Sequence, residues 1–288
     1  DAEFKPQTPD NGSTTDYSNW LKLTYSITDV SQPADLFYSE NETAFNITSV
    51  ESMAISENNG DGVFSEPVVV LPSYQYSFSK TGEHVVYVKF TDMTKIPAFA
   101  FMEKSSISKI EIPESIVTIG AGAFLLTGIQ GTLIIPDNVE YLEGYENVEP
   151  IGAFAGCHNI TNVVLGNNIK VIGNGTFCYC DNISGEVIIP DKVTDIKYGA
   201  FAVCSKITSL VIGKMVTNIE EAAFADMKSL NSIKIFSETA PNINQNTFMG
   251  VKTNGILMIP KNADYTTWMQ KDEKYLGYYN WTIQEMTE

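Results

Sequence analysis

The stretch IGAFAGCHNITNVVLGNNIKVIGNGTFCYC, residues 151–180, contains the same short pattern twice. In each copy a phenylalanine is followed three positions later by a cysteine, as Phe154–Cys157 and as Phe177–Cys180. Two close cysteines beside a histidine are compatible with a metal site, whereas residues that recur at a fixed interval are typical of stacked structural repeats. The interval along the rest of the chain decides between these interpretations.

The pattern continues on both sides of this stretch. The equivalent positions, called anchors here, are Phe101, Phe124, Phe154, Phe177, Phe201, Phe224 and Phe248. Successive anchors are 23 or 24 residues apart, except for one gap of 30 residues, which an insertion at residues 143–150 explains. Seven copies in phase predict a repeat protein, in which each unit contacts mainly its neighbours.

Each unit carries the pattern of one short β-strand. Apolar residues alternate with outward positions after the anchor, as in Ile110/Ile112 and Val163/Leu165, and a proline or glycine follows. Such alternation indicates a strand with one buried face. Ordering one unit costs about 25–45 kcal/mol of conformational entropy. Burying its roughly seven apolar side chains stabilises it by only about 10–20 kcal/mol. A unit is therefore stable only within a stack, and we predict a right-handed solenoid of seven repeats with a parallel sheet along one side.

Three cysteines share one position in consecutive repeats. Cys157, Cys180 and Cys204 each follow their anchor by three residues. Because free cysteine behaves as a small hydrophobic residue, this placement favours a vertical ladder of buried side chains. A metal site, which would need Cys178 and His158 to complete it, and a disulfide between adjacent rungs are the alternatives. Cys178 is out of phase, so we expect it to be a surface or semi-buried thiol. We predict no metal and no cofactor.

The remaining segments define the domain organisation. Residues 1–16 are polar and rich in Pro, Ser and Thr, as flexible tethers are. Residues 17–90 contain several short alternating stretches separated by turns, which predicts a small antiparallel sheet or sandwich that covers the first repeat. The repeats occupy residues 91–262, and residues 263–288 are expected to form a C-terminal cap. The predicted fold class is thus mainly β.

Charge and composition exclude several classes of partner. The formal net charge of −17 argues against nucleic acid and anionic membrane surfaces, which both favour lysine and arginine. No apolar run approaches the roughly 18 residues of a membrane-spanning helix. The sequence shows neither an initiator methionine nor a signal peptide, so we expect it to be a mature fragment.

No catalytic motif is present in the sequence. The two histidines, His84 and His158, have no nucleophile at a meaningful spacing, and no nucleotide-binding, serine-hydrolase or zinc-protease motif occurs. A glycosidase-like carboxylate pair stays open among the 35 acidic residues, although most of these stand at outward positions. We therefore predict that the protein is not an enzyme.

The repeats closely resemble the BspA-like leucine-rich repeats of bacterial surface proteins. The unit IKYGAFAVCSKITSLVIGKMVTNI, residues 196–219, matches that pattern at nearly every framework position, and the resemblance covers residues 96 to about 260. The second copy departs from it by lacking the cysteine, and the sixth by lacking both the cysteine and the proline or glycine. The resemblance implies a leucine-rich-repeat solenoid in a secreted or lipid-anchored protein of the bacterial outer surface that makes noncatalytic contacts.

The outward positions of the predicted sheet suggest a contact surface. One column of them reads Ile134, Val164, Ile188 and Val211. A contiguous exposed apolar stripe marks an interaction site, although β-branched residues also suit a flat parallel sheet for structural reasons alone. The loop that leads into the insertion offers a second candidate, Tyr141, Tyr145 and Glu146, which we expect beside the stripe.

Two binding functions follow from these features. The first is adhesion, in which the sheet face recognises a host or microbial protein or peptide. The alternative is a glycan-binding accessory role in polysaccharide uptake, with the insertion or the C-terminal aromatic residues, Trp268 and Trp281 among them, as the binding surface. An exposed aromatic platform and a buried cap are both open for the C-terminal segment.

Overall fold

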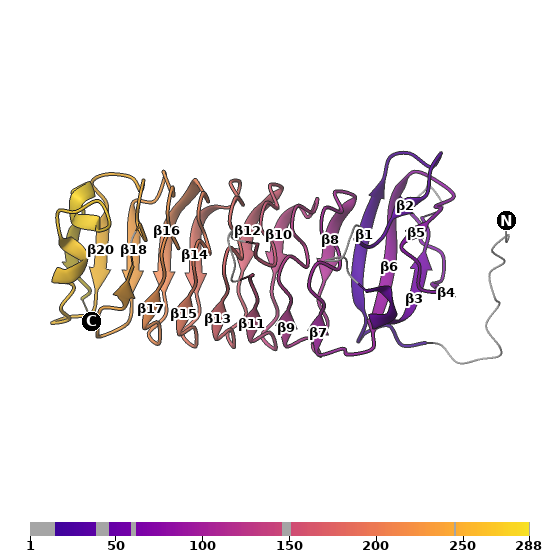
Figure 1. The fold of residues 1–288 in the computed structure, drawn as a ribbon, viewed down its shortest axis with the longest axis horizontal. Coiled ribbons are helices and arrows are strands. Elements are labelled where there is room, and N and C mark those ends of the chain that lie inside the picture. Colours follow the sequence, from indigo (N-terminus) through magenta and orange to yellow (C-terminus); the bar gives the residue numbers. More distant parts are fainter. Residues whose placement is uncertain (1–14, 39–45, 59–61, 146–150, 245, 288) are drawn as a thin grey trace.

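The computed structural model describes residues 15–38, 46–58, 62–145, 151–244 and 246–287. The molecule is elongated, with an antiparallel sheet at the N-terminal end, a stack of parallel strands along its length, and short 3-10 helices at the C-terminal end (Figure 1). No helix among the described residues is long and apolar enough to cross a membrane. The predicted fold class, a mainly β solenoid preceded by an antiparallel sheet, is confirmed.

The N-terminal sheet covers the open end of the first repeat. Its strand order is β4-β3-β6-β1-β8, and its strands are β1 (Leu21–Ile27), β3 (Val50–Ser56), β4 (Val68–Val70), β6 (Gly82–Phe90) and β8 (Ile107–Glu111). Strand β8 belongs to the first repeat, and it pairs antiparallel with β1, with Leu23 opposite Ile110. The pairing gives the terminal coil the backbone partners that an uncovered solenoid end lacks. A second small sheet joins β2 (Ala34–Asp35) and β5 (Gln75–Tyr76), and η1 (Ile47–Ser49) precedes β3.

The longer strands of the repeats form what we call the broad face. After β8 these strands are β10 (Gly131–Ile134), β12 (Ile160–Val164), β14 (Ser184–Ile189), β16 (Lys206–Ile212), β18 (Ser232–Ile235), β20 (Ile256–Ile259) and β21 (Thr282–Glu285). Strand β10 pairs with β12. Strands β14, β16, β18, β20 and β21 form one continuous parallel sheet. Strand β21 lies in the segment predicted as a cap, so this segment also adds an eighth strand to the face.

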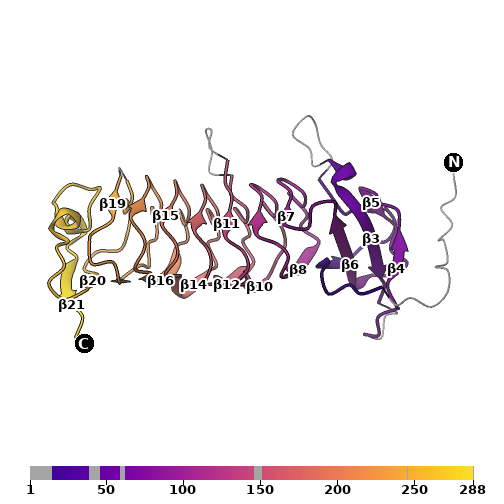
Figure 2. The same ribbon diagram turned by 90° about the horizontal axis from the view of Figure 1, so that it is seen from below.

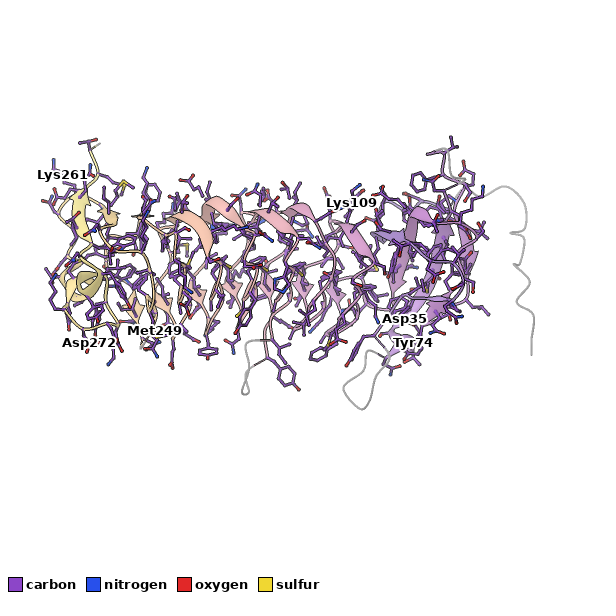
Figure 3. The ribbon with its side chains drawn as sticks, turned by 90° about the horizontal axis from the view of Figure 1, so that it is seen from above. Asp35, Tyr74, Lys109, Met249, Lys261 and Asp272 are labelled. Atoms are coloured by element: carbon purple, nitrogen blue, oxygen red, sulfur yellow. The ribbon has the colours of Figure 1, made fainter. Side chains whose placement is uncertain are left out.

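Seven strands of two residues each form the opposite side, called the narrow face here. They are β7 (Lys95–Ile96), β9 (Thr118–Ile119), β11 (Tyr141–Leu142), β13 (Val171–Ile172), β15 (Asp195–Ile196), β17 (Asn218–Ile219) and β19 (Asn242–Ile243). All seven are paired in parallel and in sequence order. Figure 2 shows the two faces on opposite sides of the stack, and in Figure 3 Lys109 of β8 and Met249 lie on opposite sides.

The anchor phenylalanines form one continuous column through the core. All seven are fully buried, and consecutive rings lie 5.2–6.0 Å apart with interplanar angles of 4–25°. The column continues into the end segments. The ring centroids of Phe37 and Phe101 are 5.3 Å apart, and those of Trp268 and Phe248 are 5.2 Å apart. Each coil of the solenoid therefore contributes one anchor, and the interval between anchors in the sequence is the length of one coil.

Tight turns flank each anchor and explain its glycine-rich surroundings. The residues two positions before and after Phe177 are Gly175 and Tyr179, and both have positive φ, 58° and 60°. This left-handed conformation costs a non-glycine residue roughly 1–2 kcal/mol. The stack tolerates this cost at Tyr179 because the surrounding coils fix the turn.

Two short helices close the C-terminal end. They are η2 (Thr266–Met269) and η3 (Leu276–Tyr279). Trp268 is fully buried and donates its indole N–H to the carbonyl oxygen of Pro241 at 3.0 Å. Trp281 is 3% exposed and donates to the carbonyl oxygen of Lys252 at 2.7 Å. Both indoles complete the core, so this segment presents no exposed tryptophan platform to a sugar.

Candidate functional site

An apolar stripe runs along the centre of the broad face. In the parallel register Ile134 is opposite Val164, and Ile188 is opposite Val211. The exposed fractions of Ile134, Val164 and Ile188 are 61%, 47% and 58%. Val211 is half-buried. These four residues, called the stripe below, lie where the alternation of the sequence predicts them.

Charged and polar side chains border the stripe at both ends. Toward the N-terminus, Lys109 pairs with Glu83 at 3.2 Å and Glu111 with Lys22 at 2.6 Å. Toward the C-terminus, the residue opposite Val211 is Lys234. An apolar centre with a polar rim is the arrangement found in protein-binding surfaces.

Tyr141 and Tyr145 lie on the other side of the molecule, so their predicted place beside the stripe is wrong. Tyr141 belongs to β11 on the narrow face, whereas Ile134 belongs to β10 on the broad face. The segment that joins them turns round one edge of the stack and points Val139 into the core, where it is fully buried. Glu146 lies outside the described residues.

The base of the insertion is held in place by backbone and side-chain hydrogen bonds. Gly144 and Gly152 form an antiparallel bridge, and the amide of Tyr145 donates to the carbonyl oxygen of Ile151 at 2.9 Å. Asn174 of the next coil donates its Nδ2 to the carbonyl oxygen of Tyr145 at 3.1 Å. The backbone of Tyr145 is thus held on one side by Ile151 and on the other by Asn174 of the next coil.

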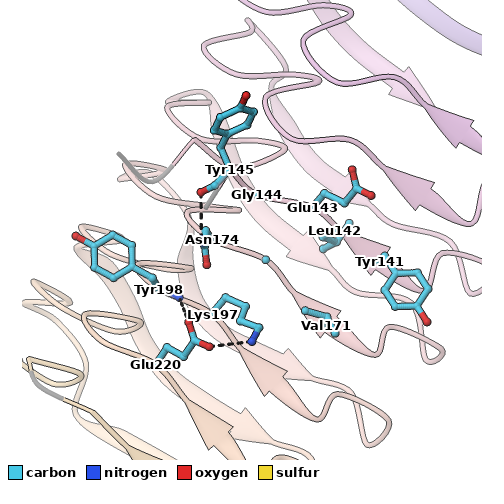
Figure 4. Close-up of a pocket in the computed structure, with 11 residues that line it drawn as sticks. Tyr141, Leu142, Glu143, Gly144, Tyr145, Val171, Asn174, Lys197, Tyr198 and Glu220 are labelled. Carbon is cyan, nitrogen blue, oxygen red and sulfur yellow. Dashed lines mark hydrogen bonds and ion pairs between the residues drawn. The ribbon is translucent and has the colours of Figure 1, made fainter. Parts of the chain in front are cut away.

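An open groove of about 640 Å³ lies on the narrow face beside this base (Figure 4). Its lining includes Val171 and Gly173, and Gly173 has no side chain. Tyr145 and Tyr198 stand on one side of the groove, and Tyr141 and Glu143 on the other (Figure 4). The three tyrosines are 38–46% exposed.

The charged groups in and beside the groove are paired with one another. Lys95 binds both carboxylate oxygens of Glu143, at 2.9 and 3.1 Å. Lys197 lies 2.8 Å from Glu220 and 3.7 Å from Asp195. Its hydrogen bond to Glu220 raises the pKa of Lys197, so this amine stays protonated.

Sequence reasoning missed five polar or aromatic residues that line this groove: Glu143, Asn174, Lys197, Tyr198 and Glu220. Asn174 and Tyr198 both stand three residues before their anchors, and Lys197 precedes Tyr198. Equivalent positions in successive repeats lie side by side in a solenoid. The position three residues before each anchor holds Asn174 and Tyr198, and aligning it with the segment around Tyr145 could have pointed to the groove from sequence alone.

The cysteine ladder is confirmed as part of the core. Cys157, Cys180 and Cys204 are fully buried, and each thiol donates to the carbonyl oxygen of an anchor in the preceding coil, at 3.0–3.1 Å. All four cysteines are free. The surface or semi-buried location predicted for Cys178 is wrong, because Cys178 is 1% exposed and packs in a second column with Ala155 and Ala202.

Burial of the thiols makes them unreactive in the folded protein. Desolvation raises the pKa of Cys157 to about 11 and that of Cys178 to about 12, and it raises the pKa values of Cys180 and Cys204 as well. The thiolate is the reactive form, so we expect a disulfide-exchange reagent at about pH 8 to label no cysteine of the native protein within minutes. All four are expected to react in guanidinium. Rapid labelling of the native protein would contradict the buried ladder.

The histidines occupy unrelated environments. His84 is fully buried, its Nε2 is 2.8 Å from the carbonyl oxygen of Lys80, and its Nδ1 accepts from the amide of Asn58. His158 is paired with Asp181 at 2.9 Å on an exposed turn. Within the described ranges, no group of three or more His, Cys, Asp or Glu residues is placed to bind a metal ion.

Comparison with known protein families agrees with the repeat assignment. The family model described as BspA type leucine rich repeat region matches residues 72–146 and 150–267, in six copies. A leucine-rich repeat protein from Bacteroides ovatus ATCC 8483 is 20% identical, with a TM-score of 0.44 over 68% of this chain and 52% of the other. The chain thus spans about half the length of that protein. No curated protein matches the chain.

Proposed function

Because this chain belongs to the BspA-type leucine-rich repeat family, we propose that it is a noncatalytic cell-surface adhesion protein that binds a host or microbial protein through the stripe. Proteins with such repeats are commonly surface and binding proteins, and their solenoid is generally an interaction scaffold. The negative charge of the chain favours partners other than nucleic acid.

The exposure of the stripe carries this proposal. Three large aliphatic side chains, Ile134, Val164 and Ile188, are each about half exposed on successive strands of the broad face. Structural preference explains β-branched residues in a strand, but it does not require them on the solvent side. A protein ligand with a complementary apolar surface would bury them, and the charged side chains that border the stripe would orient it.

Substitution of one central stripe residue tests the proposal. We expect Ile188→Lys to abolish capture of the protein ligand from surface extracts, because a charge would have to be buried at the centre of the interface. The free energy of unfolding is expected to change by less than about 0.5 kcal/mol, since Ile188 is exposed. Capture is measured by pull-down with quantitative mass spectrometry.

Met215→Lys is the matched control. Met215 is 48% exposed and follows β16, outside the stripe. We expect this variant to capture the same protein as the wild type. Equal capture by Ile188→Lys and by the wild type would place the binding site elsewhere.

The cellular location is a second part of the proposal. Family members are typically bacterial surface proteins, and we propose that this chain is displayed outside the cell on a lipid anchor. Antibody labelling of intact cells, compared with permeabilised cells, and metabolic labelling with a fatty acid test the two statements separately.

A further inference from the structure

We propose that the groove on the narrow face is a second binding site, separate from the stripe, and that it takes a neutral saccharide. The inference depends on three properties of the described residues: the shape of the groove, the pairing of its charges and the exposure of its tyrosines. It goes beyond protein binding by the broad face.

The shape of the groove follows from the repeat register. Tyr141, Val171 and Asp195 are aligned on β11, β13 and β15. Two residues further along each coil come Glu143, Gly173 and Lys197. Gly173 adds no side chain between the other two, so a depression opens on its coil and runs toward the base of the insertion.

Glycine is required at position 173 for a backbone reason as well. A Cβ atom at this position would lie 2.3 Å from the carbonyl oxygen of Leu142 in the preceding coil. Such a contact forces the backbone to move, so a larger residue cannot fill the depression without distorting the coil. The groove is thus a fixed feature of the stack.

The charges in the groove do not favour an ionic ligand. Lys197 is held by Glu220 and Asp195, and Glu143 is held by Lys95. A charged ligand would have to replace one of these internal partners and would gain little from the exchange. A neutral ligand leaves all of these pairs intact.

Uncommitted polar groups remain beside the ion pairs. Asn174 uses its Nδ2 to bind the carbonyl oxygen of Tyr145, and its Oδ1 has no protein partner among the described residues. The same holds, within the described ranges, for the hydroxyl groups of Tyr145 and Tyr198. Three neutral groups that donate or accept single hydrogen bonds suit the hydroxyl groups of a sugar.

The tyrosine rings supply the apolar part of the site. Tyr145 packs on Phe99 with ring centroids 5.9 Å apart, and the amide of Tyr198 donates to Glu220 at 3.2 Å. The ring of Tyr145 and the backbone of Tyr198 are therefore held in place before a ligand binds, which lowers the entropic cost of binding. A sugar ring has an apolar face edged by hydroxyl groups, and it matches rigid amphipathic rings beside hydrogen-bonding groups.

Affinity electrophoresis in gels that contain a polysaccharide tests the proposal. The probes are starch, dextran and mixed-linkage β-glucan, with polygalacturonate as an anionic counterpart. We expect at least one neutral polysaccharide to retard the wild-type protein. Tyr198→Ala is expected to raise the dissociation constant about tenfold, through loss of a ring contact and a hydrogen bond worth about 1.4 kcal/mol together.

Tyr179→Ala is the matched control, since Tyr179 is 54% exposed and does not line the groove. It is expected to be retarded like the wild type. Ile188→Lys is also expected to keep polysaccharide binding, and Tyr198→Ala to keep protein capture, so the two proposed sites fail or succeed independently. Retardation by none of the neutral probes, by polygalacturonate alone, or equally for Tyr198→Ala and the wild type would overturn the assignment.

Discussion

Phe177→Ala is expected to lower the free energy of unfolding by about 3–5 kcal/mol. The ring is fully buried and lies 5.8 Å from Phe154 and 5.3 Å from Phe201, so its removal leaves a cavity at the centre of the column. Neighbouring coils cannot collapse into this cavity, because their strands are fixed by hydrogen bonds on both faces. Urea unfolding followed by circular dichroism measures the loss.

Two further variants test whether the loss of stability is specific to the buried anchor ring or would follow from any substitution in this coil. Phe177→Leu retains most of the buried volume and is expected to cost less than half as much as alanine. Tyr179→Ala removes an exposed ring from the same coil and is expected to change stability by less than about 1 kcal/mol. If Phe177→Ala were no more harmful than Tyr179→Ala, the anchors would not be the structural column of the solenoid.

Trp268→Ala is the second substitution with a large expected effect, again about 3–5 kcal/mol. The indole covers Phe248, the last anchor, and its N–H satisfies the carbonyl oxygen of Pro241. Its loss exposes the end of the core to water and leaves a buried acceptor without its partner. Stability is measured by urea unfolding as for Phe177.

The position of this effect along the chain is also predictable. Because each coil contacts mainly its neighbours, hydrogen exchange should increase most in β20 and β18 and least in β1 and β6. Tyr278→Ala serves as the control, since Tyr278 is in the same segment and 51% exposed. A uniform increase in exchange over all strands would contradict a local capping role.

The sequence located the stripe but not the groove. Ile134 and Ile188 alternate with buried residues in their strands. This alternation, together with their distance from the anchor, is enough to assign them to the outer surface of the broad face from sequence alone. The groove depends on side chains from four coils, including Glu143 and Tyr198, and on where the insertion leaves the stack. The division into tether, N-terminal domain, repeats and cap, with its boundaries at residues 16, 90 and 262, stays a prediction.

Cys178 shows the limit of reasoning from one framework position. It stands one residue after its anchor, where other repeats have Ala155 and Ala202, and this column is buried by the turns that surround it. A pattern centred on the cysteines three residues after the anchors does not reveal a second buried column. The same limit applies to the insertion, whose sequence does not state which face it leaves.

The sequence by itself determined the solenoid, because seven phenylalanines spaced by 23 or 24 residues, apart from the one insertion, have a common environment only when successive coils superimpose. The tertiary structure alone decided how the ends are closed and where surface residues converge. Strand β1 pairs with β8, Trp268 covers Phe248, and Tyr145 stands near Tyr198 on the narrow face. Each of these contacts joins residues outside the repeat pattern or from different coils, so it depends on the path of the backbone in space and not on sequence period.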